Sequence, residues 1–194
     1  MHFLVDKLTN YCIRRNIIDE NTRIWFEYGI EKRLSTIIVA IPFFLLALLL
    51  TNVSTAVAFY ISFYWLRSRI NGFHAKTVGQ CFVVSLLAEF VYCGVLYNIL
   101  FHWDMLIYIT VSFIIIFVYA PYNHPHMGLS STDISLCRKH SRIRIICLSV
   151  VTIICLISGC LDVAKGIVLG SSMAALMLII PYIYKKGVNQ YERN

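Results

Sequence analysis

Charged residues are scarce in this chain of 194 residues: they make up 14% of it, while hydrophobic residues make up 59%. A soluble domain usually has about a quarter charged residues and under half apolar ones. A protein core cannot absorb such an excess, so lipid must be the solvent for much of the surface. The composition therefore excludes an ordinary soluble domain and predicts a membrane protein.

Three other features are also missing. Residues 1–33 are too polar to contain the apolar core of a secretory signal, so we expect the targeting information to lie in the membrane spans. No Gly/Ser linker, internal repeat or low-complexity tract divides the chain, which favours one folded domain. The seven cysteines are odd in number and irregularly spaced, and several lie in apolar runs, so a disulfide framework is not expected.

Six apolar runs account for the hydrophobic content. A helix that crosses the bilayer needs about 20 apolar residues, roughly 17 at the least, so the second and fourth runs are marginal. Backbone polar groups must be satisfied inside lipid, so the spans are expected to be helices. We therefore predict an all-α polytopic membrane protein with about six transmembrane helices. The runs are Leu34–Leu50, Val53–Leu66, Val78–Leu100, Met105–Ala120, Ile143–Cys160 and Val163–Tyr184.

The placement of lysine and arginine predicts the orientation, because these residues are enriched on the cytoplasmic side of membrane proteins. With six spans and a cytoplasmic N-terminus, Lys165 is the only one of the 17 basic residues that falls in an outside segment. Removing one span would place a basic cluster outside. The pattern therefore predicts a multi-pass protein with both termini in the cytoplasm.

The stretch Met1–Arg33 has apolar residues at roughly helical spacing among basic ones. This pattern suits one or two amphipathic helices at an anionic membrane surface, and it equally suits a short cytosolic helical cap. We expect three parts in the chain: an amphipathic segment at 1–33, a transmembrane domain at 34–186 that includes a loop at 67–81, and a cytoplasmic tail at 187–194.

The loop between the second and third runs contains His74 and Cys81, seven residues apart. On a continuous helix this separation is about 10 Å, too far for a hydrogen bond, so the two side chains can act together only if the chain folds back. Gly72 and Gly79 permit such a fold. A helix that starts near Gly79 would place Cys81 in its first turn, where the helix dipole stabilises a thiolate. The alternative is a surface histidine and a packing cysteine.

The same segment resembles the AgrB family of bacterial accessory-gene-regulator membrane peptidases. The resemblance rests on the run Gly72-Phe-His-Ala75, on Cys81 and on Arg67. The size of the chain, its six apolar runs and its basic amphipathic N-terminal segment also match. Many members have two adjacent glycines where this chain has Asn71-Gly72.

The resemblance implies a cysteine endopeptidase that processes a small quorum-sensing propeptide. Cys81 is the implied nucleophile and His74 the general base and acid, while Arg67 and Gly72 support the reaction or bind substrate. Cleavage releases an acidic tail and leaves an acyl-enzyme, and a propeptide cysteine or serine then closes a thiolactone or lactone ring.

The implied partners are a propeptide with an amphipathic leader and an acidic C-terminal tail, membrane lipid, and a second copy of the chain. No metal, cofactor or nucleic acid is expected, and the implied location is the bacterial cell membrane. Small residues on the last run are candidates for close packing of helices between two copies. They are Gly166, Gly170, Ser171 and Ala174.

Glu89 leaves other functions open, because it is the only acid inside a long apolar run. An intramembrane carboxylate is a functional candidate, so a small transporter or channel is a second hypothesis and a non-catalytic scaffold a third. We favour the interpretation that Glu89 points inward and pairs with a hydroxyl such as that of Ser112 or Thr152.

A metal site is a further alternative in the loop before the fifth run. Nitrogen and sulfur ligands at these spacings can form a tetrahedral zinc site. The competing interpretation is a polar loop with a proline turn, and the family resemblance predicts no metal. The residues concerned are His124, His126, Cys137 and His140.

Overall fold

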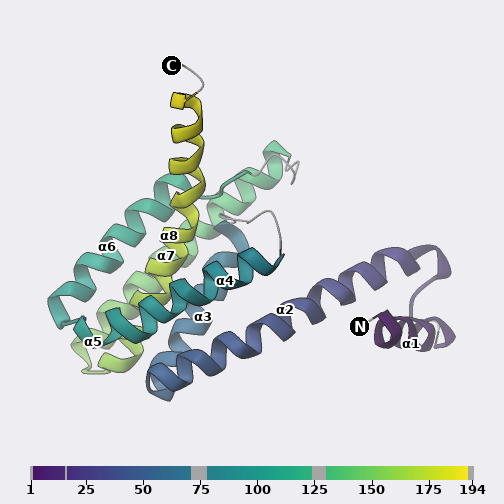
Figure 1. Cartoon of the computed structure of the whole chain (residues 1–194), viewed down its shortest axis with the longest axis horizontal. Coiled ribbons are helices and arrows are strands. Elements are labelled where there is room, and N and C mark those ends of the chain that lie inside the picture. The colour runs from purple at the N-terminus through teal and green to yellow at the C-terminus, as the bar shows by residue number, and fades with distance from the viewer. Residues whose placement is uncertain (1, 16, 71–77, 124–129, 192–194) are drawn as a thin grey trace. The chain divides into compact units, whose positions relative to one another are not determined.

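The computed structural model describes residues 2–15, 17–70, 78–123 and 130–191, and every regular element in these ranges is a helix. The all-α prediction is therefore confirmed. In chain order (Figure 1), the elements are α1 (His2–Arg14), the 3-10 helix η1 (Glu20–Thr22), α2 (Arg23–Leu50), α3 (Val53–Ile70), α4 (Val78–Glu89), the π-helix η2 (Phe90–Leu96), α5 (Tyr97–Ile99), α6 (His102–Tyr119), α7 (Ser131–Ile157) and α8 (Leu161–Tyr191).

All six apolar runs are helical over most of their length, and the third is divided among α4, η2 and α5. Among the described residues, three stretches are long and apolar enough to cross a membrane: Phe82–Ile99, Ser131–Ile157 and Leu161–Ile183. Shorter apolar helices cover Ala40–Leu50 and Trp103–Tyr119. These helices fit a membrane protein, whereas the number of crossings stays a prediction.

The chain divides into two compact units, with the boundary between Phe43 and Phe44 inside α2. In the first unit α1 is amphipathic, as predicted, and its Thr9 is fully buried. Arg23 at the start of α2 donates hydrogen bonds to Asp6 of α1 at 2.6 Å and to Glu27 at 2.9 Å. It stays a prediction that this unit attaches to a membrane surface. The predicted boundaries of the transmembrane domain at 33/34 and 186/187 also stay predictions.

Local capping residues set the starts of two helices in the second unit. The Asn52 side chain accepts a hydrogen bond from the Thr55 backbone at 2.8 Å and caps α3. Ser130 and Asp133 form a reciprocal capping box at the start of α7. Each cap satisfies backbone N–H groups that a helix leaves unpaired at its start.

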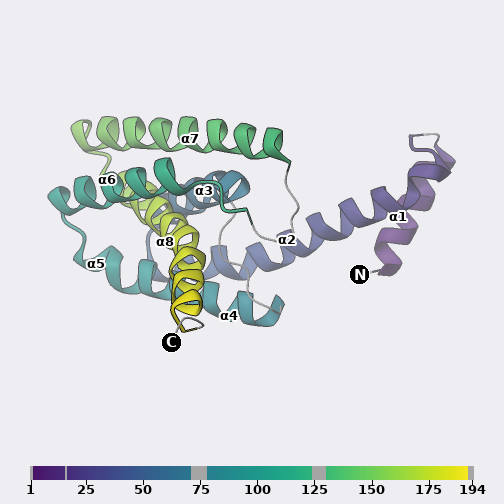
Figure 2. The same ribbon diagram turned by 90° about the horizontal axis from the view of Figure 1, so that it is seen from above.

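The second unit is built around α8, which contacts α3, α6, α7 and η2. Protein buries 72% of the apolar stretch of α8, against 22% of α7 and 11% of Phe82–Ile99. Helices α6 and α7 run beside each other on this framework (Figure 2). The helix that contains Cys81 is thus peripheral, whereas α8 is central.

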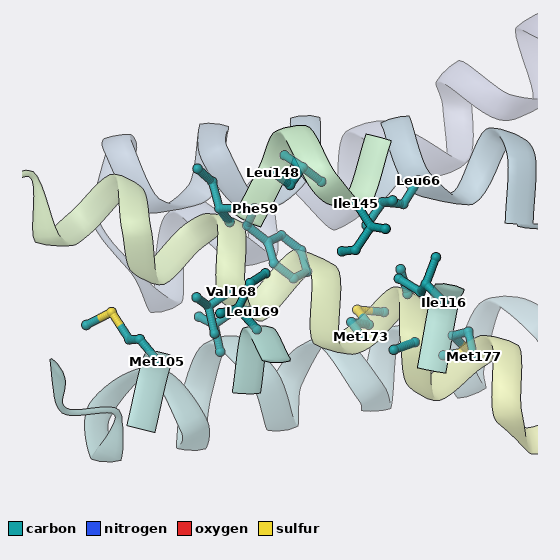
Figure 3. Close-up of a cluster of buried hydrophobic side chains, with 14 of the residues drawn as sticks. Phe59, Leu66, Met105, Ile116, Ile145, Leu148, Val168, Leu169, Met173 and Met177 are labelled. Carbon is teal, nitrogen blue, oxygen red and sulfur yellow. The ribbon is translucent and has the colours of Figure 1, made fainter. Parts of the chain in front are cut away.

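The core of this unit contains side chains from four helices (Figure 3). Phe59 and Leu66 of α3 meet Ile116 of α6, Ile145 of α7 and Met173 of α8, and none is more than 2% exposed. Lipid tails are as apolar as these side chains, so close packing rather than removal from water holds such helices together.

The closest helix pair is α3 and α8, which approach at two glycines of α8. A Cβ atom at Gly166 would lie 2.7 Å from the Cβ of Ala58 and would overlap the carbonyl oxygen of Thr55. A Cβ atom at Gly170 would lie 2.5 Å from the carbonyl oxygen of Phe59. Because backbone atoms are involved, a larger side chain would push the two helices apart.

This packing corrects one prediction. Gly166 and Gly170 face α3 of the same chain, and Ser171 and Ala174 are fully buried. The prediction that these four residues offer a surface to a second copy is therefore wrong. The sequence identified them as small residues for close helix packing, but their partner is an internal helix.

Substitution of Gly170 by alanine is expected to destabilise the protein by about 1–3 kcal/mol, because the added methyl group overlaps the α3 backbone. Gly94→Ala is the matched control, since the nearest atoms to its added Cβ lie at 3.8 Å, an ordinary contact. Thermal unfolding in one detergent measures both. Equal melting temperatures for the two variants would contradict the close α3–α8 approach.

Candidate functional site

The last turns of α3 place Arg67 at the start of the loop that the sequence identifies as catalytic. Leu66 and Ile70, one helical turn apart, are fully buried and hold this end of α3 in the core. Arg67 lies between them and is half-buried. A basic residue near a helix C-terminus also interacts favourably with the helix dipole.

The predicted dyad lies only partly within the described residues. Gly72 and His74 are outside them, so the distance between the His74 and Cys81 side chains stays a prediction. Helix α4 begins at Val78, which places Cys81 in the first turn. Because residues 71–77 lie outside the described part of the chain, the predicted helix start near Gly79 stays a prediction.

The predicted reactivity of the Cys81 thiol rests on its position near the start of a helix. The first four N–H groups of a helix have no partner within the helix and the dipole is positive there, and both features generally favour a thiolate. The other six cysteines are all free. Of these, only Cys160 precedes a helix directly, and Asp162 adds a negative charge to that helix start.

Arg144 of α7 contacts the same end of α3. Its Nη1 atom donates hydrogen bonds to the backbone carbonyl oxygen of Trp65 and to the hydroxyl of Ser68. The guanidinium carbon also lies 5.5 Å from the centre of the Trp65 ring. Helix α7 therefore holds the turn of α3 that contains Arg67.

Other helix ends nearby are held in a similar way. The Tyr122 backbone N–H donates to the carbonyl oxygen of Ile70, the last residue of α3, at 3.0 Å. At the end of α6, Arg142 donates to the Phe117 carbonyl at 3.2 Å and Tyr182 donates to the Tyr119 carbonyl at 2.9 Å. Carbonyl groups at the ends of two helices thus gain partners from other elements.

Positive charge collects at this end of the second unit. At the opposite end of α3, the Thr55 hydroxyl donates a hydrogen bond to the carbonyl of Asp162 at 2.9 Å, so the start of α3 lies beside the first turn of α8. Lys165, one turn further along α8, lies at that opposite end, 5.0 Å from the centre of the Tyr97 ring. The basic residues at the site's end of the unit are Arg67, Arg69, Arg138, Lys139, Arg142 and Arg144.

The contacts of Arg142 and Arg144 were missed by sequence reasoning, which used both residues only as charges that set orientation. Arg144 and Trp65 are 79 residues apart in the chain. No motif or periodicity connects residues at such a separation. Only the packing of α7 against α3 brings them together.

The zinc alternative cannot be assembled from the described part of the chain. His124 and His126 lie outside it. On α7, Cys137 is half-buried and His140 is exposed. The ranges that the structure describes contain no group of three or more metal-binding side chains, and the alternative with all four residues stays untested.

Glu89 is the last residue of α4 and is fully buried, as predicted for an inward-pointing acid. Neither of its carboxyl oxygens has a hydrogen-bond partner among the described residues. Ser112 pairs with Ser172 at 3.0 Å, and Thr152 donates to the carbonyl of Leu148 at 2.8 Å. The predicted pairing of Glu89 with Ser112 or Thr152 is therefore wrong.

The surroundings of Glu89 make it a second candidate site. The phenol of Tyr60 and the thiol of Cys93 lie within electrostatic range of its carboxyl group. The π-helix η2 begins at the next residue, and π-helical segments occur frequently at functional sites. A buried acid inside a span that lacks a partner is also a functional candidate.

Comparison with protein families finds a match over most of the chain. The family model described as accessory gene regulator B matches residues 5–179, which is nearly the whole chain. The chain belongs to the AgrB family. No curated protein and no solved structure matches it.

The match confirms the family resemblance, whereas the roles assigned to Arg67, Gly72, His74 and Cys81 stay predictions. It supports a role in processing the accessory gene regulator autoinducer. Together with the three long apolar helices, it supports a membrane protein.

Replacement of Glu89 by methionine, which has a similar length, is expected to raise stability by about 1–3 kcal/mol. The substitution removes a buried polar group that has no hydrogen-bond partner among the residues that the structure describes. Ser112→Ala is the control, since it removes a hydroxyl that does have partners and should not stabilise. Both are measured by thermal unfolding in detergent. A lower melting temperature for Glu89→Met would indicate that the carboxyl group has a stabilising partner.

Proposed function

We propose that this AgrB-family protein is a membrane cysteine endopeptidase that cleaves the C-terminal part of a small quorum-sensing propeptide and closes its product into a ring. The observation that carries the proposal is the position of Cys81 in the first turn of α4, inside the family match. His74, seven residues earlier in the chain, is the assigned base.

The first half of the reaction forms an acyl-enzyme. His74 takes the proton of the Cys81 thiol, and the sulfur attacks a peptide carbonyl of the propeptide. The oxyanion that develops is stabilised by Arg67 or by the free N–H groups in the first turn of α4. The C–N bond then breaks, His74 returns the proton to the departing amine, and the acidic tail leaves as a thioester forms on Cys81.

The second half releases the product as a ring. A thioester retains acyl reactivity, so a propeptide thiol or hydroxyl can attack the same carbonyl while His74 takes its proton. The bond to Cys81 breaks, and the proton returns to the sulfur. Ring closure competes with hydrolysis because a well-positioned internal nucleophile has an effective concentration of about 10⁵ M or more.

The charge distribution supports a propeptide with an acidic tail as the partner. Arg69, Arg138 and Lys139 are exposed at the end of the second unit that contains Arg67. A patch of one sign attracts a peptide segment of the opposite sign and raises the rate of encounter. The amphipathic leader of such a propeptide would bind at the membrane surface.

The proposed setting is the bacterial cell membrane, with about six crossings and both termini in the cytoplasm. The basic residues near Arg67 and the opposite location of Lys165 support this orientation. A homodimer is part of the proposal. Its contact surface lies outside Gly166, Gly170, Ser171 and Ala174, because these residues are already buried in the chain.

Cys81→Ala and His74→Ala are each expected to reduce propeptide cleavage at least 100-fold, because one removes the nucleophile and the other the general base. Co-expression with the propeptide and mass measurement of the products tests this. Cys137→Ala, a cysteine substitution in another polar segment, should leave cleavage unchanged. Normal cleavage by either of the first two variants would refute the dyad.

Labelling with iodoacetamide tests the state of the thiol without substrate. Near neutral pH, Cys81 should react before Cys137 and the exposed Cys160, which lie near opposite ends of α7. In His74→Gln the reaction of Cys81 should shift to higher pH, because no base takes its proton, while the reference cysteines keep their profiles. An identical Cys81 profile in both proteins would remove His74 from the mechanism.

A small transporter or channel is the second candidate function, and it is favoured by the buried carboxyl group of Glu89, which has no hydrogen-bond partner in the described part of the chain. The two functions make opposite demands on the same variants. A transporter requires Glu89 and tolerates Cys81→Ala, whereas the peptidase requires Cys81 and tolerates Glu89→Met.

A further inference from the structure

We propose that Arg144 is a positioning residue that fixes the last turns of α3, and with them Arg67, for the acyl-transfer reaction. This inference rests on the function proposed above. It assigns Arg144 no contact with substrate, since its side chain acts through α3.

The contacts of Arg144 bracket Arg67 in the chain. The Nη1 atom donates to the carbonyl oxygen of Trp65 and to the hydroxyl of Ser68, two residues before Arg67 and one residue after it. Ser68 itself donates to the Trp65 carbonyl at 2.9 Å. One guanidinium group therefore ties two positions of the same helical turn to α7.

Arginine suits this contact for two reasons. Its planar group presents several N–H donors in a fixed geometry and can lie over an aromatic ring, as Arg144 does over Trp65. The C-terminal end of a helix also has a partial negative charge that attracts a cation. Lysine has the charge but lacks the planar group that lies over the Trp65 ring, so it reproduces only part of the contact.

The rest of α3 is fixed by other contacts. Asn52 caps its start, and Gly166 and Gly170 of α8 hold its middle. Beyond the middle, Arg144 and the Tyr122 backbone N–H donate hydrogen bonds to α3 from other elements. Arg144 therefore contributes a hydrogen-bonding side chain to the turn that contains Arg67.

Arg142 provides a matched control on the same helix. It is the same residue type two positions earlier, but its side chain donates to the carbonyl of Phe117 on α6 and lies 4.3 Å from that ring. Arg142→Ala removes the same charge from the same helix as Arg144→Ala. Only the latter releases α3.

The test measures steady-state cleavage of the propeptide by the full-length protein in nanodiscs. Arg144→Ala is expected to lower kcat by about tenfold to a hundredfold with little change in KM, because small misplacements of a reacting group have effects of this size. Arg142→Ala should keep the wild-type kcat. Arg144→Lys should recover part of the lost kcat, and Ser68→Ala should add little to Arg144→Ala, because the two residues share one interaction.

Hydrogen exchange of the segment 65–70 supplies a readout independent of chemistry. Exchange should accelerate in Arg144→Ala and not in Arg142→Ala. Unchanged hydrogen exchange in Arg144→Ala would overturn the positioning role of Arg144. A wild-type kcat for Arg144→Ala, measured beside an inactive Cys81→Ala, would also overturn that role and would leave the proposed peptidase function standing. Normal cleavage by Cys81→Ala overturns the proposed function itself, and the positioning role with it.

Discussion

Two glycines four residues apart on α8 let its backbone approach that of α3 to within contact distance, and the second unit depends on this approach. In lipid, helices gain little by hiding apolar side chains from one another, so the fit between their surfaces decides how they pack. The missing side chains at Gly166 and Gly170 provide that fit. Helix α3, held in this way, brings Arg67 to the cytoplasmic end that we propose, and the chain continues from there toward His74.

The helix ends near Arg67 show how positive charge can serve structure and orientation together. Carbonyl groups at a helix C-terminus lack partners within the helix, and inside or near lipid such groups are costly. Arg142 of α7 supplies a donor to such a carbonyl of α6, and Arg144 adds a donor to the last turns of α3. Arg142 and Arg144 are among the basic residues that favour the proposed cytoplasmic location of the first half of α7. The same two residues also join this half of α7 to α6 and α3.

The sequence predicts the helices well and their mutual contacts poorly. The apolar runs give most of the helical segments, because hydropathy is a local signal. Contacts between helices depend on which helix faces lie inward. Examples are the approach of Gly170 to α3, the lack of a hydrogen-bond partner for Glu89 among the described residues, and the contact of Arg144 with Trp65. In a chain that is apolar on most sides, hydropathy does not distinguish a lipid-facing side from a packed one.

The low burial of Phe82–Ile99 has a consequence for how the protein is handled. Only 11% of this stretch is buried within the chain, so much of the helix that begins just before Cys81 is open to the lipid of the proposed membrane. Extraction into micelles replaces the lipid around this helix with detergent and so changes its surroundings. The contacts between α3 and α8 are made within the protein and are kept. The thickness and fluidity of the surrounding membrane are therefore part of what sets the depth of the nucleophile.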